Sequence, residues 1–290
     1  MNFFQKLFGG KSNEPEPVKF EQPAKPQLTP EEFMATDAVK QLVAKYKKQA
    51  TLLRPHRVAE GVSPAESKFG GEANMYGFSE YPCCDFCKTP FEFIVQAYKR
   101  DFEFAYFPND SNLFQLFRCP NENCAGYEQS YYFTTKVFYF NVPEGQTLQM
   151  SRPAITYELP DGELAECSLS PLVIENDLPV WEDYEDNDGS DIEEQFGEEW
   201  SEYLMEEYNA KPYTKFGGYP SFTQNSHYPN CKCGKTKEFF FQLSSDDPSN
   251  ETDPKYHSPH GIMIGDMGNV YFYVCKACGP QTIESYMDCC

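Results

Sequence analysis

The 290-residue chain has few basic side chains: 24 lysines and arginines stand against 45 aspartates and glutamates, a formal net charge of −21. This imbalance argues against nucleic acid as a partner, because like charges repel. It favours a basic protein or peptide. Histidine is also scarce, with four in the chain. None of them lies in a zincin, catalytic-triad or phosphate-loop pattern, so we expect a protein that is not an enzyme.

Long hydrophobic runs are missing as well. The apolar run at residues 3–8 is too short for a signal-peptide core or a membrane span, and no later stretch approaches 18 apolar residues. We therefore expect a cytoplasmic protein with no membrane span. In a reducing compartment the twelve cysteines should not form a disulfide framework. They are better interpreted as metal ligands where their spacing allows it.

Most of the acidity is confined to one segment. Residues 175–207 contain fifteen acidic side chains and no lysine or arginine, and the rest of the chain carries a net charge of only −6. Apolar residues recur at helical spacing in its second part, at Ile192, Phe196, Trp200, Tyr203, Leu204 and Tyr208. This pattern predicts an amphipathic helix within an acidic connecting segment over residues 175–210.

Two interpretations of this helix stay open and are compatible. Its apolar face docks on the body of the protein and its acidic face is merely solvated, or the acidic face is a platform for a basic client. In the second case the candidate binding residues are Glu193, Glu194, Glu198, Glu199 and Glu202.

The N-terminal region is expected to be a disordered tail and linker over residues 1–28, because prolines recur among polar residues there. A helix is predicted over residues 29–50. Thr29 is a good N-cap, Pro30 suits the first helical position and Glu32 completes a capping box. We expect one face of this helix to pack on the body.

From Phe91 onward the pattern is that of strands. The segments FEFIVQAY, FEFAYF, LFQLFRC, YYFTTKVFYF, EFFFQLS and NVYFYVC are aromatic and β-branched, with turn residues between them. They predict a mainly β, α+β protein built from antiparallel sheets.

The chain repeats itself. The motif KFGG at residues 68–71 recurs at 215–218, YP at 81–82 recurs at 228–229, and Cys84 matches Cys231, all at a shift of 147 residues. So many ordered matches near one offset predict a duplicated unit, with a first repeat over 51–174, a second over 211–290 and a pseudo-twofold relation between them. We expect the repeats to pack as one domain.

Each repeat supplies four cysteines in two short knuckles separated by strands. The first repeat has Cys84, Cys87, Cys119 and Cys124, and the second has Cys231, Cys233, Cys275 and Cys278. This arrangement is typical of ribbon-type zinc sites. Four thiolates would fill a tetrahedral Zn²⁺, so two structural zinc sites are predicted. Cys83 could replace Cys84 as a ligand, although the alignment of the repeats favours Cys84.

The other polar candidates are weaker. His257 and His260, with Asp246 and Asp247, could form a metal or general-base site, but a solvated loop is the favoured interpretation. Asp266 is expected in a turn before the last of the predicted strands. Cys167 is interpreted as a lone structural thiol.

The motifs SKFGG, FEFIVQ, KFGGYPSFTQ, FFFQLSSDD and GDMGNVYFYV resemble the YwqG family of bacterial proteins of unknown function. CKCGKTKEFFFQL followed by NVYFYVCKACG is similar to the zinc-bearing C-terminal part of the programmed cell death protein 2 family. The resemblance spans roughly residues 51–290. It implies a duplicated β-rich fold with no established catalytic residues.

The eukaryotic relatives act as dedicated binding proteins for a basic small-subunit ribosomal protein, and some bacterial relatives are thought to be immunity or interaction proteins. The expectation is therefore a non-enzymatic, zinc-stabilised protein that shields a client, with a toxin-neutralising immunity protein as the alternative. A metal-dependent hydrolase using His257 or His260 is a third hypothesis.

Overall fold

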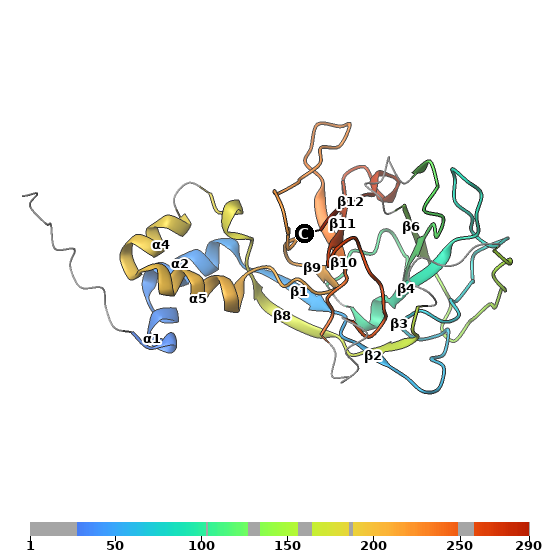
Figure 1. The fold of residues 1–290 in the computed structure, drawn as a ribbon, viewed down its shortest axis with the longest axis horizontal. Helices are drawn as coiled ribbons and strands as arrows, with labels where there is room; N and C mark the ends of the chain where they lie inside the picture. Colours follow the sequence, from blue (N-terminus) through green and yellow to red (C-terminus); the bar gives the residue numbers. More distant parts are fainter. Residues whose placement is uncertain are drawn as a thin grey trace, which may run out of the picture.

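The computed structural model describes residues 28–102, 104–126, 134–155, 164–185, 188–248 and 258–289. The expected tail therefore lies, except for residue 28, outside the described part. Within that part the chain forms two six-stranded antiparallel sheets and four α-helices (Figure 1). The predicted mainly β, α+β class is confirmed.

The strands are short. They are β1 Lys48–Leu52, β2 Pro55–Arg57, β3 Lys68–Phe69, β4 Glu92–Tyr98, β5 Leu113–Arg118, β6 Thr135–Phe140, β7 Cys167–Leu169, β8 Leu172–Asp177, β9 Lys215–Gly217, β10 Glu238–Ser244, β11 Asn269–Val274 and β12 Glu284–Asp288. Short 3-10 turns occur at Lys99–Asp101, Trp181–Asp183 and Pro280–Thr282.

The two sheets have matching strand orders. The first sheet runs β2-β7-β3-β4-β5-β6 and the second runs β8-β1-β9-β10-β11-β12. A two-stranded ribbon passes through both sheets, because β1 pairs with β8 in the second sheet and β2 pairs with β7 in the first. β1 and β8 lie next to the two ends of the predicted first repeat in sequence, but they pair within the sheet of the second repeat. The two units are therefore interlocked.

The pairing registers reproduce the sequence repeat residue by residue. Lys68 lies opposite Gln96 in the first sheet, and Lys215 lies opposite Gln242 in the second. A bulge interrupts the β4–β5 pair between residues 93 and 95, and another interrupts the β10–β11 pair between residues 239 and 241. The duplication is therefore structural as well as sequential.

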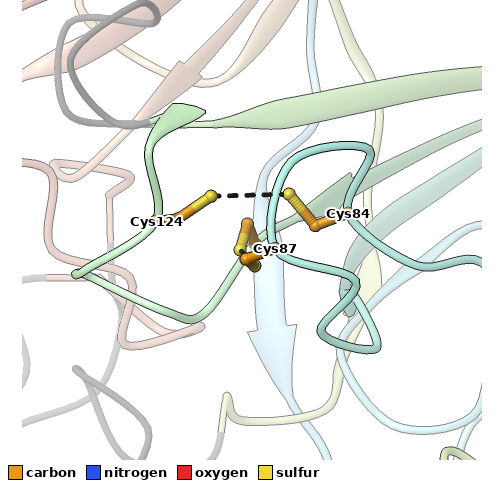
Figure 2. Close-up of side chains that lie close together, drawn as sticks. Cys84, Cys87 and Cys124 are labelled. Carbon is orange, nitrogen blue, oxygen red and sulfur yellow. Dashed lines mark hydrogen bonds between the residues drawn. The ribbon is translucent and has the colours of Figure 1, made fainter.

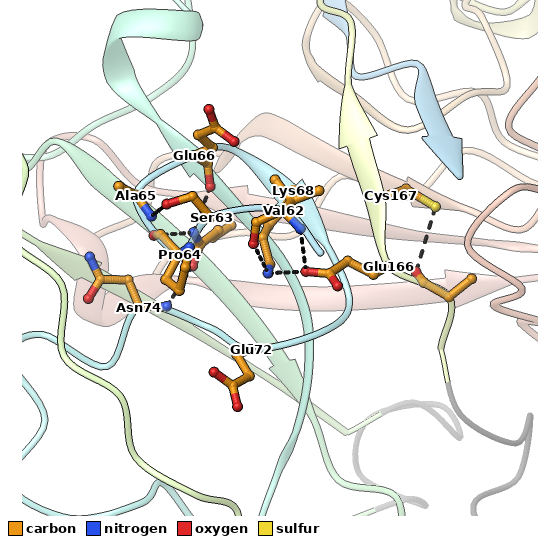
Figure 3. A network of polar contacts seen from close by, with 12 residues as sticks. Val62, Ser63, Pro64, Ala65, Glu66, Lys68, Glu72, Asn74, Glu166 and Cys167 are labelled. Atoms are coloured by element: carbon orange, nitrogen blue, oxygen red, sulfur yellow. Dashed lines mark hydrogen bonds and ion pairs between the residues drawn. The ribbon is translucent and has the colours of Figure 1, made fainter. Parts of the chain in front are cut away.

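Both copies of the KFGG motif bury an ammonium group against the ribbon. The Lys68 ammonium pairs with Glu166, next to β7, and also donates to the carbonyl of Val62 at 2.9 Å (Figure 3). The Lys215 ammonium lies 3.1 Å from the Asp177 carboxylate at the end of β8, and neither side chain is exposed. These ion pairs link β3 of the first sheet and β9 of the second sheet to the ribbon.

The glycines of the motif make room for those carboxylates. A Cβ atom on Gly218 would lie 2.1 Å from Oδ2 of Asp177, and one on Gly71 would lie 2.4 Å from Glu166. Both glycines also have positive φ angles, of 69° and 66°. The repeated Gly-Gly pair is therefore explained by close approach as well as by backbone conformation.

One apolar core lies between the two sheets. Its buried members come from both halves and include Phe69, Ile94, Val95, Phe114, Leu116, Phe216, Phe241, Leu243, Val270 and Phe272. The predicted strand FEFAYF at residues 102–107 is not a strand in its described residues. Phe102 is nevertheless fully buried in this core, so its aromatic character reflects packing from a loop.

The helices form a second, smaller core at one end of the molecule (Figure 1). They are α1 Pro30–Met34, α2 Asp37–Tyr46, α4 Asp188–Phe196 and α5 Glu198–Tyr208. Their shared buried residues are Phe33, Val39, Leu42, Tyr46, Leu178, Ile192, Phe196, Trp200 and Leu204. The apolar faces of the N-terminal and acidic helices thus pack mainly on each other, which corrects the expectation that each docks on the β body.

Both predicted helices are broken. The helix expected over residues 29–50 begins with the predicted capping box at Thr29 but stops after Met34. Thr36 then caps a second helix, accepting from the backbone N–H of Val39, and the chain enters β1 at Lys48. A hydroxyl that caps the backbone competes with a continuous helix.

The acidic helix breaks at Gly197, which has φ 113° and ψ 161°. This region of backbone conformation is essentially restricted to glycine. We expect Gly197→Ala to lower the free energy of unfolding by about 1–3 kcal/mol, measured by chemical denaturation. Gly145→Ala is the control, since Gly145 has φ 73° and no atom within 4 Å of an added Cβ. A larger loss at Gly145 would contradict this account of the break.

Candidate metal centres

The first four-cysteine group joins a turn before β4 to the chain after β5. Cys84 and Cys87 lie in the turn, Cys119 follows the last residue of β5, and Cys124 lies five residues further on. The Sγ atoms of Cys84 and Cys124 are 3.6 Å apart (Figure 2). Those of Cys87 and Cys119 are 3.5 Å apart. All four predicted residues of this group therefore converge.

The second group repeats this plan. Cys231 and Cys233 precede β10, Cys275 follows the last residue of β11, and Cys278 lies in the next turn. The Sγ atoms of Cys233 and Cys275 are 3.6 Å apart. Within each group the four sulfur atoms lie within 4.8 Å of one another.

Both groups fit a four-sulfur metal site. A tetrahedral ion with metal–sulfur bonds of about 2.3 Å separates its ligands by roughly 3.8 Å, close to the distances found here. The same distances are far longer than the ~2.05 Å of a disulfide bond. Each group could therefore hold one metal ion, and its four thiolates would leave no position open for a substrate.

The structure separates Cys83 from Cys84. Cys84 is fully buried and belongs to the first group, whereas Cys83 is exposed and its thiol lies 3.5 Å from the carbonyl oxygen of Tyr81. The geometry thus places Cys84 in the group, as the alignment of the repeats favoured.

Thiol acidity differs within each group. Burial tends to raise the pKa of Cys87, but hydrogen bonds from the hydroxyl and backbone amide of Thr89 lower it to about 6. The backbone amide of Lys235 lowers the pKa of Cys233 to about 7. Burial raises the pKa of Cys119. A lowered pKa gives Cys87 and Cys233 thiolate character near neutral pH, the form that binds metal.

The glycines beside the second group serve the turns rather than the sulfur atoms. The amides of Gly234 and Gly279 donate to the carbonyl oxygens of Cys231 and Cys275, both at 2.9 Å. These two amides therefore stabilise the turns that carry the cysteines. In the first group the amide of Gly126 does donate to a sulfur, Sγ of Cys124, at 3.3 Å.

His260 lies in the protein interior, so its interpretation as part of a solvated loop is wrong. Its Nε2 donates to Oδ2 of Asp247 at 3.0 Å, and its Nδ1 accepts the backbone N–H of Ile262 at 3.1 Å. Ser258 Oγ also lies 3.1 Å from Nδ1. His260 and Asp247 are fully buried and Ser258 is 1% exposed.

This buried cluster connects the two halves of the protein. The ring of His260 stacks on Phe69 of the first repeat at 4.5 Å, and Asp247 accepts the backbone N–H of Thr214 in the second. Sequence reasoning missed this role because the spacing of Ser258, His260 and Asp247 carries no packing signal. His257 lies outside the described residues, and Asp266 is exposed in a turn before β11, as expected.

Cys167 is a buried thiol, whereas the five acidic candidate residues are exposed. Cys167 is buried in β7 within the main core, as expected of a structural thiol. Glu193 and Glu194 on α4, and Glu198, Glu199 and Glu202 on α5, are all exposed. The break at Gly197 thus leaves the five carboxylates on two consecutive helices.

In the part of the chain that the structure describes, no helix combines the length and apolar character that crossing a membrane requires.

Comparison with known proteins identifies the family. The model of a domain of unknown function, DUF1963, matches residues 67–277, which is more than half of the chain. The match begins just before the first KFGG motif and includes seven of the eight clustered cysteines. A comparison with curated proteins found no match. The chain therefore belongs to the DUF1963 family, whose function is uncharacterised.

Proposed function

We propose that this protein is a non-enzymatic interaction or chaperone-like protein, stabilised by two structural Zn²⁺ ions, that binds a basic client through its acidic helices. The observation that carries the proposal is the surface of α4 and α5. Eight exposed carboxylates lie on these two helices, at Asp191, Glu193, Glu194, Glu198, Glu199, Glu202, Glu206 and Glu207. The sequence between residues 175 and 207 contains no lysine or arginine.

The acidic surface is held in place by packing. Ile192, Phe196, Trp200 and Leu204 are buried against α1 and α2, and the Phe33 ring stacks on Trp200 at 4.6 Å. The Lys45 ammonium pairs with Asp188 at 2.7 Å and tethers the start of α4. A partner therefore meets carboxylates on ordered helices, which reduces the entropy lost on binding.

Zinc is the metal that we propose for the two cysteine groups. Four thiolates in tetrahedral array are the ligand set typical of structural zinc. A closed shell of sulfur supplies folding energy and leaves no coordination site for catalysis. The sealed surroundings of His260 likewise favour a structural role over that of a general base.

The resemblance to the YwqG family and to the programmed cell death protein 2 family supports a binding role. The resemblance to the second family implies eukaryotic relatives that bind a basic ribosomal protein. A toxin-neutralising immunity protein remains the alternative, since it uses the same binding physics with a different partner. The identity of a stoichiometric partner recovered from cells would decide between them.

The charge of the acidic surface gives a direct test with a basic dodecapeptide of alternating lysine and serine. We expect the fivefold variant Glu193→Gln, Glu194→Gln, Glu198→Gln, Glu199→Gln and Glu202→Gln to bind it at least about tenfold more weakly at low salt, measured by calorimetry. The matched control removes the same charge from exposed positions elsewhere, with Glu60→Gln, Glu72→Gln, Glu80→Gln, Glu122→Gln and Glu144→Gln. Equal losses in both variants would show that net charge alone attracts the peptide and would reject the acidic helices as the site.

A further inference from the structure

Each sheet ends in a strand that pairs with another strand on one side only, within the described residues. β6 is the last strand of the first sheet and β12 the last strand of the second. The ribbon of β1, β2, β7 and β8 links the opposite sides of the two sheets. In the described ranges no strand pairs with the outer side of β6 or β12. Sheet edges of this kind present unpaired N–H and C=O groups that another strand can bind.

The hydrogen bonds of β6 show which groups face outward. The carbonyl oxygens of Thr134 and Phe140 both accept from the chain of β5, at 2.8 and 2.9 Å from the amides of Cys119 and Asn112. In an antiparallel strand, successive residues direct their backbone groups to opposite sides. The backbone groups of residues 135, 137 and 139 therefore point away from β5.

The same argument extends to β12 through the repeat. Phe140 lies opposite Leu113 on β5, and Asp288 lies opposite Asn269 at the matching position on β11. Residues 283, 285 and 287 therefore correspond to the outward positions 135, 137 and 139.

These two edges border a single groove. A cavity of about 420 Å³ is lined by residues 135–139 of β6 and by residues 280, 281 and 283–285 at β12, with Phe272 from β11. Thr135 Oγ1 lies 3.2 Å from Ser285 Oγ, so the edges approach each other at that point. The volume lies in the range of roughly 300–1,000 Å³ usual for ligand sites.

The chemistry of the groove favours an uncharged occupant. Val137, Tyr139 and Ile283 are partly buried against the main core and supply apolar walls. The charged side chains of the lining are already paired, Lys136 with Asp85 at 2.7 Å and Glu284 with Lys237 at 2.5 Å. Backbone donors and acceptors above an apolar surface match an extended polypeptide, whose main chain bonds to the edge while alternate side chains enter the groove.

We propose that this groove binds an extended, uncharged segment of a partner polypeptide, which adds a strand to the open edge of β6. This surface is distinct from the acidic helices. The inference therefore stands whether or not the client is basic.

A peptide library provides the probe. A phage library of random dodecapeptides is selected against the whole protein, and the best binder is synthesised with blocked ends. We expect alternating apolar positions in the selected peptides. Binding should slow the hydrogen exchange of the amides of Val137 and Tyr139 at least tenfold, while the inward amide of Phe138 changes much less. Failure to select a binder, or protection confined to other regions, would overturn the proposal.

Variants of both partners give the control. Val137→Pro removes one outward N–H, and we expect it to weaken the binding of the peptide at least tenfold. The fivefold glutamine variant of the acidic helices should bind the peptide normally. If Val137→Pro unfolds the protein, N-methylation of the peptide replaces it: methyl groups on one alternate set of its amides should abolish binding and those on the other set should not. Equal effects of the two sets would also overturn the proposal.

Discussion

Replacing Cys231 and Cys275 together by serine should reduce the bound zinc from two ions per chain to one. It should also lower the melting temperature by on the order of 10 °C, because a structural zinc site supplies folding free energy directly. The loss should be concentrated in the second sheet, since these residues lie beside β10 and β11. Metal analysis, thermal unfolding and hydrogen exchange of β10 and β11 measure the three effects.

The matched control carries the same number of cysteine-to-serine changes outside the groups. Cys83→Ser with Cys289→Ser alters two thiols that belong to neither group of four. We expect two zinc ions per chain and a melting temperature within about 3 °C of the parent protein. Unchanged metal content and stability in the Cys231 and Cys275 variant would refute the zinc assignment of the second group.

Lys215→Met should lower the free energy of unfolding by about 3–5 kcal/mol. The substitution leaves the Asp177 carboxylate buried without its cation, and an unpaired charge in the interior is strongly destabilising. Among the described residues, Asp177 would retain the backbone amides of Tyr219 at 2.8 Å and Lys211 at 3.2 Å. Denaturant unfolding monitored by tryptophan fluorescence measures the change.

The control uses an exposed ion pair of the same kind. The Lys276 ammonium lies 2.8 Å from Glu238, and both side chains are more than half exposed. Because solvent screens such pairs, Lys276→Met should change stability by less than about 1 kcal/mol. Comparable losses at Lys215 and Lys276 would show that the buried pair is not the link between the second sheet and the ribbon.

Several features of the fold could be predicted from local sequence because their causes are local. The capping box at Thr29 is present, and the aromatic β-branched segments around residues 92–98, 113–118, 238–244 and 269–274 are strands. Helix caps and strand patterns depend on neighbours in the chain. The cysteine groups were predictable for a related reason, since knuckle spacing constrains where thiols can meet.

Other features depended on contacts between distant residues. The short strands β3 and β9 contain two and three residues, too few for a periodic signal. An apolar stripe on a helix does not indicate which surface will cover it. The acidic helix was therefore expected to pack on the β body. In the structure α1 and α2 cover it, more than 140 residues away in sequence.

The sequence by itself determined the duplication, the eight clustered cysteines and the concentration of acid between residues 175 and 207. These are properties of residue identity and spacing. Only the tertiary structure decided that one ribbon interlocks the two sheets, that Lys68 and Lys215 bury their charges against it, and that His260 connects the halves. The physical reason is that each of these features depends on a contact with a carboxylate, ring or backbone group that is far away in the sequence. Local residue spacing does not indicate which distant group will lie beside a given residue.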